Sequence, residues 1–169
     1  MSLLLPGAAD AAPSPPLCLL PSVRSHCRAL VVVAGGGRDL DWPAARVALA
    51  LRQAVSGRLV QLLLHGGARG ADQAIAAAAH RLGWAAQAIP AQWARYGIAA
   101  GPVRNGQMLR RATEEAATFQ RTCTTGVLVI AFPGRKGTAS LLDQARRLQG
   151  RTPLPIEILD LGAGAGAGA

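Results

Sequence analysis

The stretch ALVVVAGGGRD, residues 29–39, joins an apolar run directly to three glycines, an arginine and an aspartate. A near-continuous apolar run is typical of a strand that is covered on both faces, as in a parallel sheet. Two further apolar runs end in the same way: residues 59–64 precede HGGARGAD (65–72), and residues 127–132 precede PGRKGT (133–138). The sequence therefore predicts parallel strands whose carboxyl ends lead into glycine-rich loops.

Helical periodicity separates these strands. Apolar side chains recur at helical spacing within residues 42–55, where Pro43 suits a first turn, and within residues 71–82 and 139–148. Weaker apolar segments, expected as a buried strand at 85–89 and a shorter strand at 156–159, complete the pattern. The alternation predicts an α/β fold, a single Rossmann-like open, mainly parallel sheet with helices on both faces.

The chain of 169 residues is long enough for one such domain, which we expect over residues 29–160. Residues 1–28 are rich in proline and predict an irregular arm, while residues 161–169 are almost all glycine and alanine and predict a flexible tail. The apolar runs are shorter than a membrane span, and three cysteines form no framework or CxxC pair. We therefore expect a cytoplasmic protein with no membrane partner.

The glycine-rich loops predict a ligand site. Parallel strands bring all three loops to one edge of the sheet, where glycine lets backbone N–H groups approach an anion and each loop adds an arginine. None of the loops matches GxGxxG or GxxxxGK[ST], which disfavours an ordinary dinucleotide site and a P-loop ATPase. No metal site is expected from the spacing of histidine, cysteine and carboxylate residues, and no cofactor is expected.

The motifs, in their order, resemble the YspA-related branch of the SLOG superfamily, a group of small Rossmann-like bacterial and phage proteins. The resemblance covers residues 29–158 and rests on GGRD (36–39), HGGARGAD (65–72), WARYG (93–97), AGPVRN (100–105) with Met108, and AFPGRKGT (131–138). It implies a pocket for a nucleotide or a nucleotide-derived small molecule such as ADP-ribose or an NAD-like compound. The superfamily also includes cytokinin-activating phosphoribohydrolases and a DNA-processing protein.

The residues expected to bind the ligand come from all of these motifs. They are Gly36, Gly37, Arg38, Gly66, Gly67, Arg69, Gly70, Asp72, Trp93, Tyr96, Arg104, Asn105, Pro133, Gly134, Arg135, Gly137 and Thr138. Guanidinium groups suit phosphate oxygens, although arginines also form ordinary basic surfaces. Trp93 and Tyr96 lie in an expected loop, where either ring would stack on a nucleobase or anchor the loop.

Three polar residues have two or more interpretations. Asp72 would stabilise a helix start, accept hydrogen bonds from a ribose, or orient Arg69. Asn105 would bind a base edge or cap a helix through residues 108–112. His65 would serve as a ligand group or general base, or pack in its loop.

One departure from the superfamily bears on catalysis. The phosphoribohydrolases carry a PGGxGTxxE motif, whereas here Arg135 replaces the second glycine and Leu141 replaces the glutamate. A leucine cannot stabilise an oxocarbenium ion, so that activity does not transfer directly, and the catalytic residues are unknown. Asp39 and Asp72 are candidates for a relocated acid. Residues 113–125 are expected to form an extended connection.

These observations lead to a nucleotide-derivative sensor or processing domain. The net charge of +9 and the DNA-processing relatives keep nucleic-acid binding as an alternative. A structural role with a decayed pocket is a further alternative, as is a phosphoribohydrolase-like enzyme with a relocated acid. Homo-oligomerisation is left open.

Overall fold

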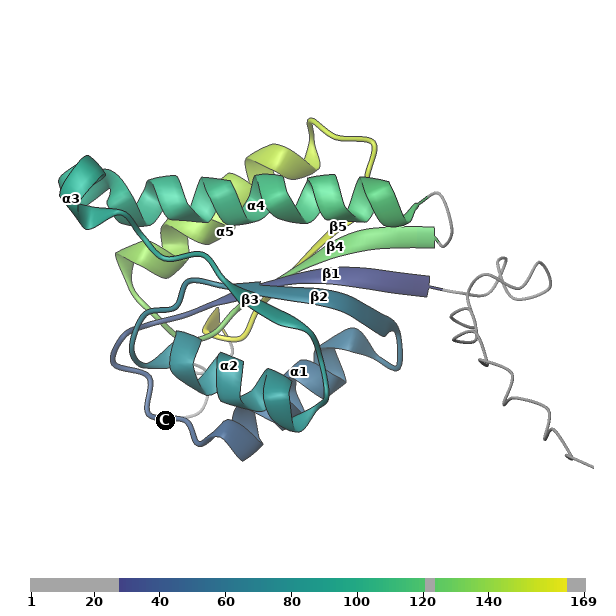
Figure 1. The fold of residues 1–169 in the computed structure, drawn as a ribbon, viewed down its shortest axis with the longest axis horizontal. Coiled ribbons are helices and arrows are strands. Elements are labelled where there is room, and N and C mark those ends of the chain that lie inside the picture. Colours follow the sequence, from purple (N-terminus) through teal and green to yellow (C-terminus); the bar gives the residue numbers. More distant parts are fainter. Residues whose placement is uncertain (1–27, 121–123, 164–169) are drawn as a thin grey trace, which may run out of the picture.

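A computed structural model describes residues 28–120 and 124–163, and the predicted arm and most of the tail lie outside these ranges. The described strands form one parallel sheet in the order β3-β2-β1-β4-β5. Figure 1 shows helices on both sides of it, which confirms the predicted α/β class. The elements in chain order are β1 (Arg28–Gly35), α1 (Ala44–Val55), β2 (Leu59–His65), α2 (Ala71–Arg81), β3 (Ala86–Ala88), α3 (Trp93–Tyr96), η2 (Gly97–Ala99), α4 (Ala100–Phe119), β4 (Thr124–Ala131), α5 (Lys136–Gln149) and β5 (Ile156–Asp160).

The central strand β1 is buried on both faces. Leu30, Val32 and Ala34 pack in one cluster with buried residues of α1 and α2. Val31 and Val33 pack in a second cluster with buried residues of α4 and α5. Two layers of helices thus account for an apolar run without alternation, and Figure 1 shows α1 and α2 on one side of the sheet and α4 and α5 on the other.

The segment predicted as a buried strand at 85–89 is exposed instead. The structure has a three-residue strand here, β3, and the side chains of all three residues are exposed. β3 lies at the edge of the sheet and pairs only with the last residues of β2, from Leu63↔Ala86 to His65↔Ala88. The alanine-rich composition reads as apolar, but small side chains at a sheet edge bury little area.

The connection predicted at residues 113–125 is also wrong. Most of it belongs to α4, which continues to Phe119, and β4 begins at Thr124. Ala112 and Ala116 extend the buried stripe of Met108 and Leu109 along the same helix. The stripe is hard to read from hydropathy because its second half consists of alanines among charged and threonine residues.

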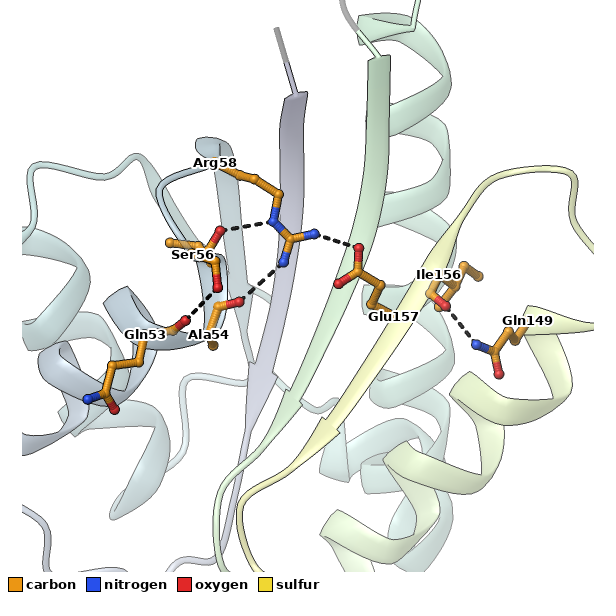
Figure 2. A network of polar contacts seen from close by, with 8 residues as sticks. Gln53, Ala54, Ser56, Arg58, Gln149, Ile156 and Glu157 are labelled. Atoms are coloured by element: carbon orange, nitrogen blue, oxygen red, sulfur yellow. Dashed lines mark hydrogen bonds and ion pairs between the residues drawn. The ribbon is translucent and has the colours of Figure 1, made fainter. Parts of the chain in front are cut away.

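Arg58 ties the end of α1 to the far edge of the sheet. Its Nε donates at 2.9 Å to Val55 O, which also accepts from the backbone N–H of Arg58. Its Nη2 donates at 3.2 Å to Ala54 O, a carbonyl in the last turn of the helix. Its Nη1 donates to Glu157 on β5. Figure 2 shows this guanidinium reaching from the start of β2 toward Glu157. One side chain thus connects α1 with β5.

Replacing Arg58 by alanine should lower the free energy of unfolding by about 1–2 kcal/mol, because Ala54 O and Glu157 lose their donor and Val55 O keeps only the backbone N–H of residue 58. The measurement is urea denaturation of the full chain. Arg52→Ala is the matched control, since Arg52 is an exposed residue in the last turn of the same helix. Equal losses from both variants would contradict the assigned role of Arg58.

Candidate functional site

A cleft of about 630 Å³ opens at the carboxyl edge of the sheet. β2 and β4 flank β1 on opposite sides, so the loops after β1 and β4 leave the sheet at the point where the strand order reverses. Both loops line the cleft, together with the starts of α2, α4 and α5 and with part of α3 and η2. The three glycine-rich loops therefore lie at one edge of the sheet, as the strand pattern predicts.

Most of the predicted site residues line this cleft. They are Gly36, Gly37, Arg38, Arg69, Asp72, Trp93, Arg104, Asn105, Arg135, Gly137 and Thr138, and Asp39 joins them. Gly66, Gly67, Gly70, Tyr96, Pro133 and Gly134 are not among the lining residues. Eight further residues complete the wall, and the sequence did not predict them as ligand-binding. They are Gly35, Ala68, Ile98, Gly101, Pro102, Met108, Lys136 and Leu141. Several of these residues lie inside the motifs quoted above, so membership of a motif could have identified them.

The peptide groups of Gly37 hold the loops together. Its N–H donates to Pro133 O at 2.9 Å, and its carbonyl accepts from Ala71 N at 3.0 Å. A Cβ on the neighbouring Gly36 would lie 2.7 Å from the Cβ of Ala71 and 2.8 Å from that of Phe132. These two glycines are thus required for the contact between the loops, independently of any contact with a ligand.

The second glycine loop has its own packing reasons. A Cβ on Gly66 would overlap the guanidinium of Arg104, and a Cβ on Gly70, whose φ is +76°, would overlap the carbonyl of Arg38. By contrast, a Cβ on Gly137 would meet no atom within 4 Å. The glycine that leaves open space beside the cleft is therefore in the first turn of α5.

A chain of polar contacts links the starts of α2, α4 and α5. Asp72 Oδ2 accepts from Ala68 N at 3.1 Å and from Arg104 Nη1 at 3.4 Å. Arg104 Nε donates to Asn105 Oδ1 at 3.1 Å, and Asn105 Nδ2 donates to Gly137 O at 3.0 Å. Asp72 thus pairs with Arg104, where the sequence had suggested Arg69. Asn105 lies inside α4 and joins α5, so the predicted cap role is wrong.

The start of α5 combines features that suit an anion. The side chain of Thr138 is 7% exposed, and its Oγ1 is buried without a hydrogen-bond partner among the described residues. Two N–H groups of the first turn, those of Thr138 and Ala139, donate to Arg135 O, whereas no side chain caps the start of the helix. The exposed Lys136 and Arg135 stand beside these N–H groups. Arg135 Nε lies 3.8 Å from the exposed carboxylate of Asp39.

Trp93 is an aromatic residue that lines the cleft. It begins the short helix α3, so the predicted loop between Pro90 and Gly101 is wrong and contains α3 followed by η2. The Trp93 side chain is 50% exposed, and the guanidinium carbon of Arg38 lies 5.1 Å from its ring centroid. Tyr96 instead pairs with Arg95 at 5.1 Å. Trp93 is therefore the ring that the cleft presents to a ligand.

His65 is buried just outside the lining. Its Nδ1 accepts from Gly67 N at 3.2 Å, which requires an unprotonated Nδ1. Burial lowers the pKa of His65 below its ordinary value; Asp72 partly offsets this effect and Arg104 adds to it. The neutral imidazole thus holds the turn after β2, in line with the loop-packing interpretation.

Within residues 28–120 and 124–163, no group of three or more histidine, cysteine or carboxylate side chains is placed to hold a metal ion. In the same ranges, no helix has both the length and the apolar character needed to cross a membrane.

The pH dependence of stability should report His65. Because its pKa is lowered by folding, the unfolded chain takes up the proton first as the pH falls through about 6.5, and stability decreases by up to about 1.4 kcal/mol per pH unit. The loss continues until the pH reaches the folded-state pKa. His65→Asn, whose amide oxygen replaces the Nδ1 acceptor, should flatten this part of the profile.

Urea denaturation between pH 7.5 and 5 measures the effect, with His80→Asn as the control because His80 is exposed on α2. Parallel profiles for wild type and His65→Asn would refute the assignment.

Gly66→Ala should displace Arg104 from Asp72, because the added methyl group takes the position of the guanidinium. Losing this partly buried pair should lower the free energy of unfolding by about 1–2 kcal/mol. Gly150→Ala is the control, since a Cβ there meets no atom within 4 Å and its φ is −83°. A Gly66→Ala variant as stable as Gly150→Ala would contradict the packing role of Gly66.

Comparison with known proteins adds no assignment to this geometry. No protein-family model matches the chain, and no curated protein matches it. The functional interpretation therefore rests on the residues of the cleft.

Proposed function

We propose that this chain is a cytoplasmic nucleotide-sensing or nucleotide-processing domain of the SLOG type, whose cleft binds a nucleotide or nucleotide-derived ligand through a phosphate group. The observation that carries the proposal is the buried, unpartnered hydroxyl of Thr138 at the uncapped start of α5. A buried hydroxyl without a partner costs free energy, and a phosphate oxygen supplies the missing acceptor. Helix N-terminal N–H groups and nearby cations favour the same group.

The rest of the cleft suits a planar ring attached to that phosphate. Trp93, Ile98, Pro102 and Met108 form a largely apolar wall beside the polar loops. Trp93 is 50% exposed and offers an indole ring for stacking, and the guanidinium of Arg38 lies 5.1 Å from the ring centroid. We propose that a nucleobase takes this position next to Arg38.

Catalysis is a separate question from binding. Leu141, at the position of the superfamily's glutamate, lines the cleft, and its Cδ2 lies 3.2 Å from where a Cβ on Gly35 would be. The acid is thus absent from the place where the related hydrolases use it. Of the two candidate acids, Asp39 is exposed and faces Arg135, whereas Asp72 is buried in the cleft wall. Asp72 is the better candidate if the chain breaks a glycosidic or phosphate-ester bond.

Nucleic-acid binding is the alternative, and the arginines on the outer surfaces of α4 and α5 favour it. Arg110, Arg111, Arg146 and Arg147 are all exposed on two helices that pack together. Two of them face acids of their own helix, Arg111 with Glu115 and Arg146 with Asp143. This partial neutralisation weakens a phosphate-binding surface, and the cleft remains the stronger site.

Thr138→Val tests the proposal because it removes the hydroxyl and keeps the shape. Adenosine monophosphate, ADP-ribose and NAD serve as probes in thermal-shift and calorimetric titrations. At least one should stabilise the wild type saturably, and Thr138→Val should bind that probe about tenfold more weakly. Without ligand, the variant should be as stable as the wild type or more stable, because it loses an unsatisfied buried group.

Arginine variants provide the second arm. Arg69→Ala and Arg135→Ala should weaken binding more than Arg146→Ala, since only the first two residues line the cleft. Equal losses from all three would indicate diffuse electrostatics. Failure of every probe to bind, or unchanged binding by Thr138→Val, would overturn the phosphate site.

A further inference from the structure

The Asp72–Arg104 pair, which lines the cleft, has unused hydrogen-bonding capacity. Both residues line the cleft, and their side chains are only 5% and 17% exposed. The contacts to Ala68, Arg104 and Asn105 use Asp72 Oδ2 and the Nη1 and Nε groups of Arg104. No partner is found in the described part of the chain for Asp72 Oδ1 or Arg104 Nη2. One acceptor and one donor of the same ion pair thus remain unused.

This pair does not suit a second phosphate. A carboxylate already occupies the first turn of α2, where it is stabilised by the positive end of the helix. The neighbouring guanidinium compensates its charge, so the couple is neutral as a unit. An incoming anion would be repelled by Asp72 Oδ1, the carboxylate oxygen that has no partner among the described residues. A neutral group that both donates and accepts hydrogen bonds fits better.

Hydroxyl groups have this property, since each donates one hydrogen bond and accepts others. Two adjacent hydroxyls on a sugar ring match a carboxylate oxygen beside a guanidinium nitrogen. Resting on the proposed function, we infer that Asp72 and Arg104 bind the 2′- and 3′-hydroxyls of a ribose, so that the cleft selects ribonucleotides over 2′-deoxyribonucleotides. Asp72 Oδ1 accepts from one hydroxyl, and Arg104 Nη2 donates to the other.

The position of the pair relative to the phosphate site supports this assignment. A single side chain, Asn105, connects them: its amide oxygen accepts from Arg104, and its amide nitrogen donates to Gly137 O in the first turn of α5. The gap spanned by one amide side chain and two hydrogen bonds is on the scale of a sugar ring. The phosphate would lie at α5, the ribose against Asn105 and the Asp72–Arg104 pair, and the base toward Trp93.

The test compares adenosine 5′-monophosphate with its 2′-deoxy and 3′-deoxy analogues by calorimetry on the full chain. Each missing hydroxyl leaves a charged group without its partner, so each analogue should bind at least about tenfold more weakly than the parent. Equal binding of all three would overturn the ribose assignment and leave the phosphate site standing. Failure of all three to bind, while inorganic phosphate and ADP-ribose also fail, would overturn both.

Variants separate recognition from structural support. Asp72→Asn and Arg104→Lys should reduce the ratio between ribose and deoxyribose affinities toward one, whereas damage to the loop alone would weaken all nucleotides by the same factor. Asp143→Asn is the matched control, since Asp143 is an exposed acid on α5 and should keep the wild-type ratio. A full ribose preference in both cleft variants, with folding verified by circular dichroism, would refute the role of the pair.

Discussion

The backbone of Gly37 is the constraint on which the cleft depends. Its N–H and carbonyl groups bond to the loop after β4 and to the start of α2, so three chain segments meet at one residue. A Cβ on Gly37 would lie 3.0 Å from both Gly134 Cα and Pro133 O. The loops can approach this closely only because side chains are missing on both sides. The same closeness holds the loop after β1 against the loop that leads into α5.

The distribution of charge in the cleft is more specific than the net charge of the chain. The cations beside α5 are exposed, and Arg135 has only a loose pairing with Asp39. Arg104, in contrast, is neutralised by a buried acid and fixed by Asn105. The cleft wall therefore carries exposed cations at the start of α5 and a charge-compensated pair where α2 and α4 begin.

The sequence predicts those parts of the structure that follow from local composition. The apolar run of β1 predicts that this strand is buried on both faces. The glycines that follow the strands predict which edge of the sheet carries the loops. The Asp72–Arg104 and Asn105–Gly137 contacts each join residues that are 32 positions apart, and they depend on how α4 crosses the sheet edge. No local pattern contains that crossing. Alanine-rich segments pose a similar difficulty, because alanine occurs on both buried and exposed faces. For this reason the exposure of β3 and the full length of α4 could not be predicted.

The strand order has a consequence for how the chain is made. β1 pairs with β2, which follows soon after it in the chain, but its other neighbour is β4, beyond α2, β3 and α4. During synthesis, one edge of β1 and the face that α4 and α5 later cover stay unpaired until most of the domain has left the ribosome. Long-range parallel pairing of this kind is slow, and apolar strands left open are prone to aggregate. The nascent chain thus passes through a vulnerable stage that ends only when β4 joins β1.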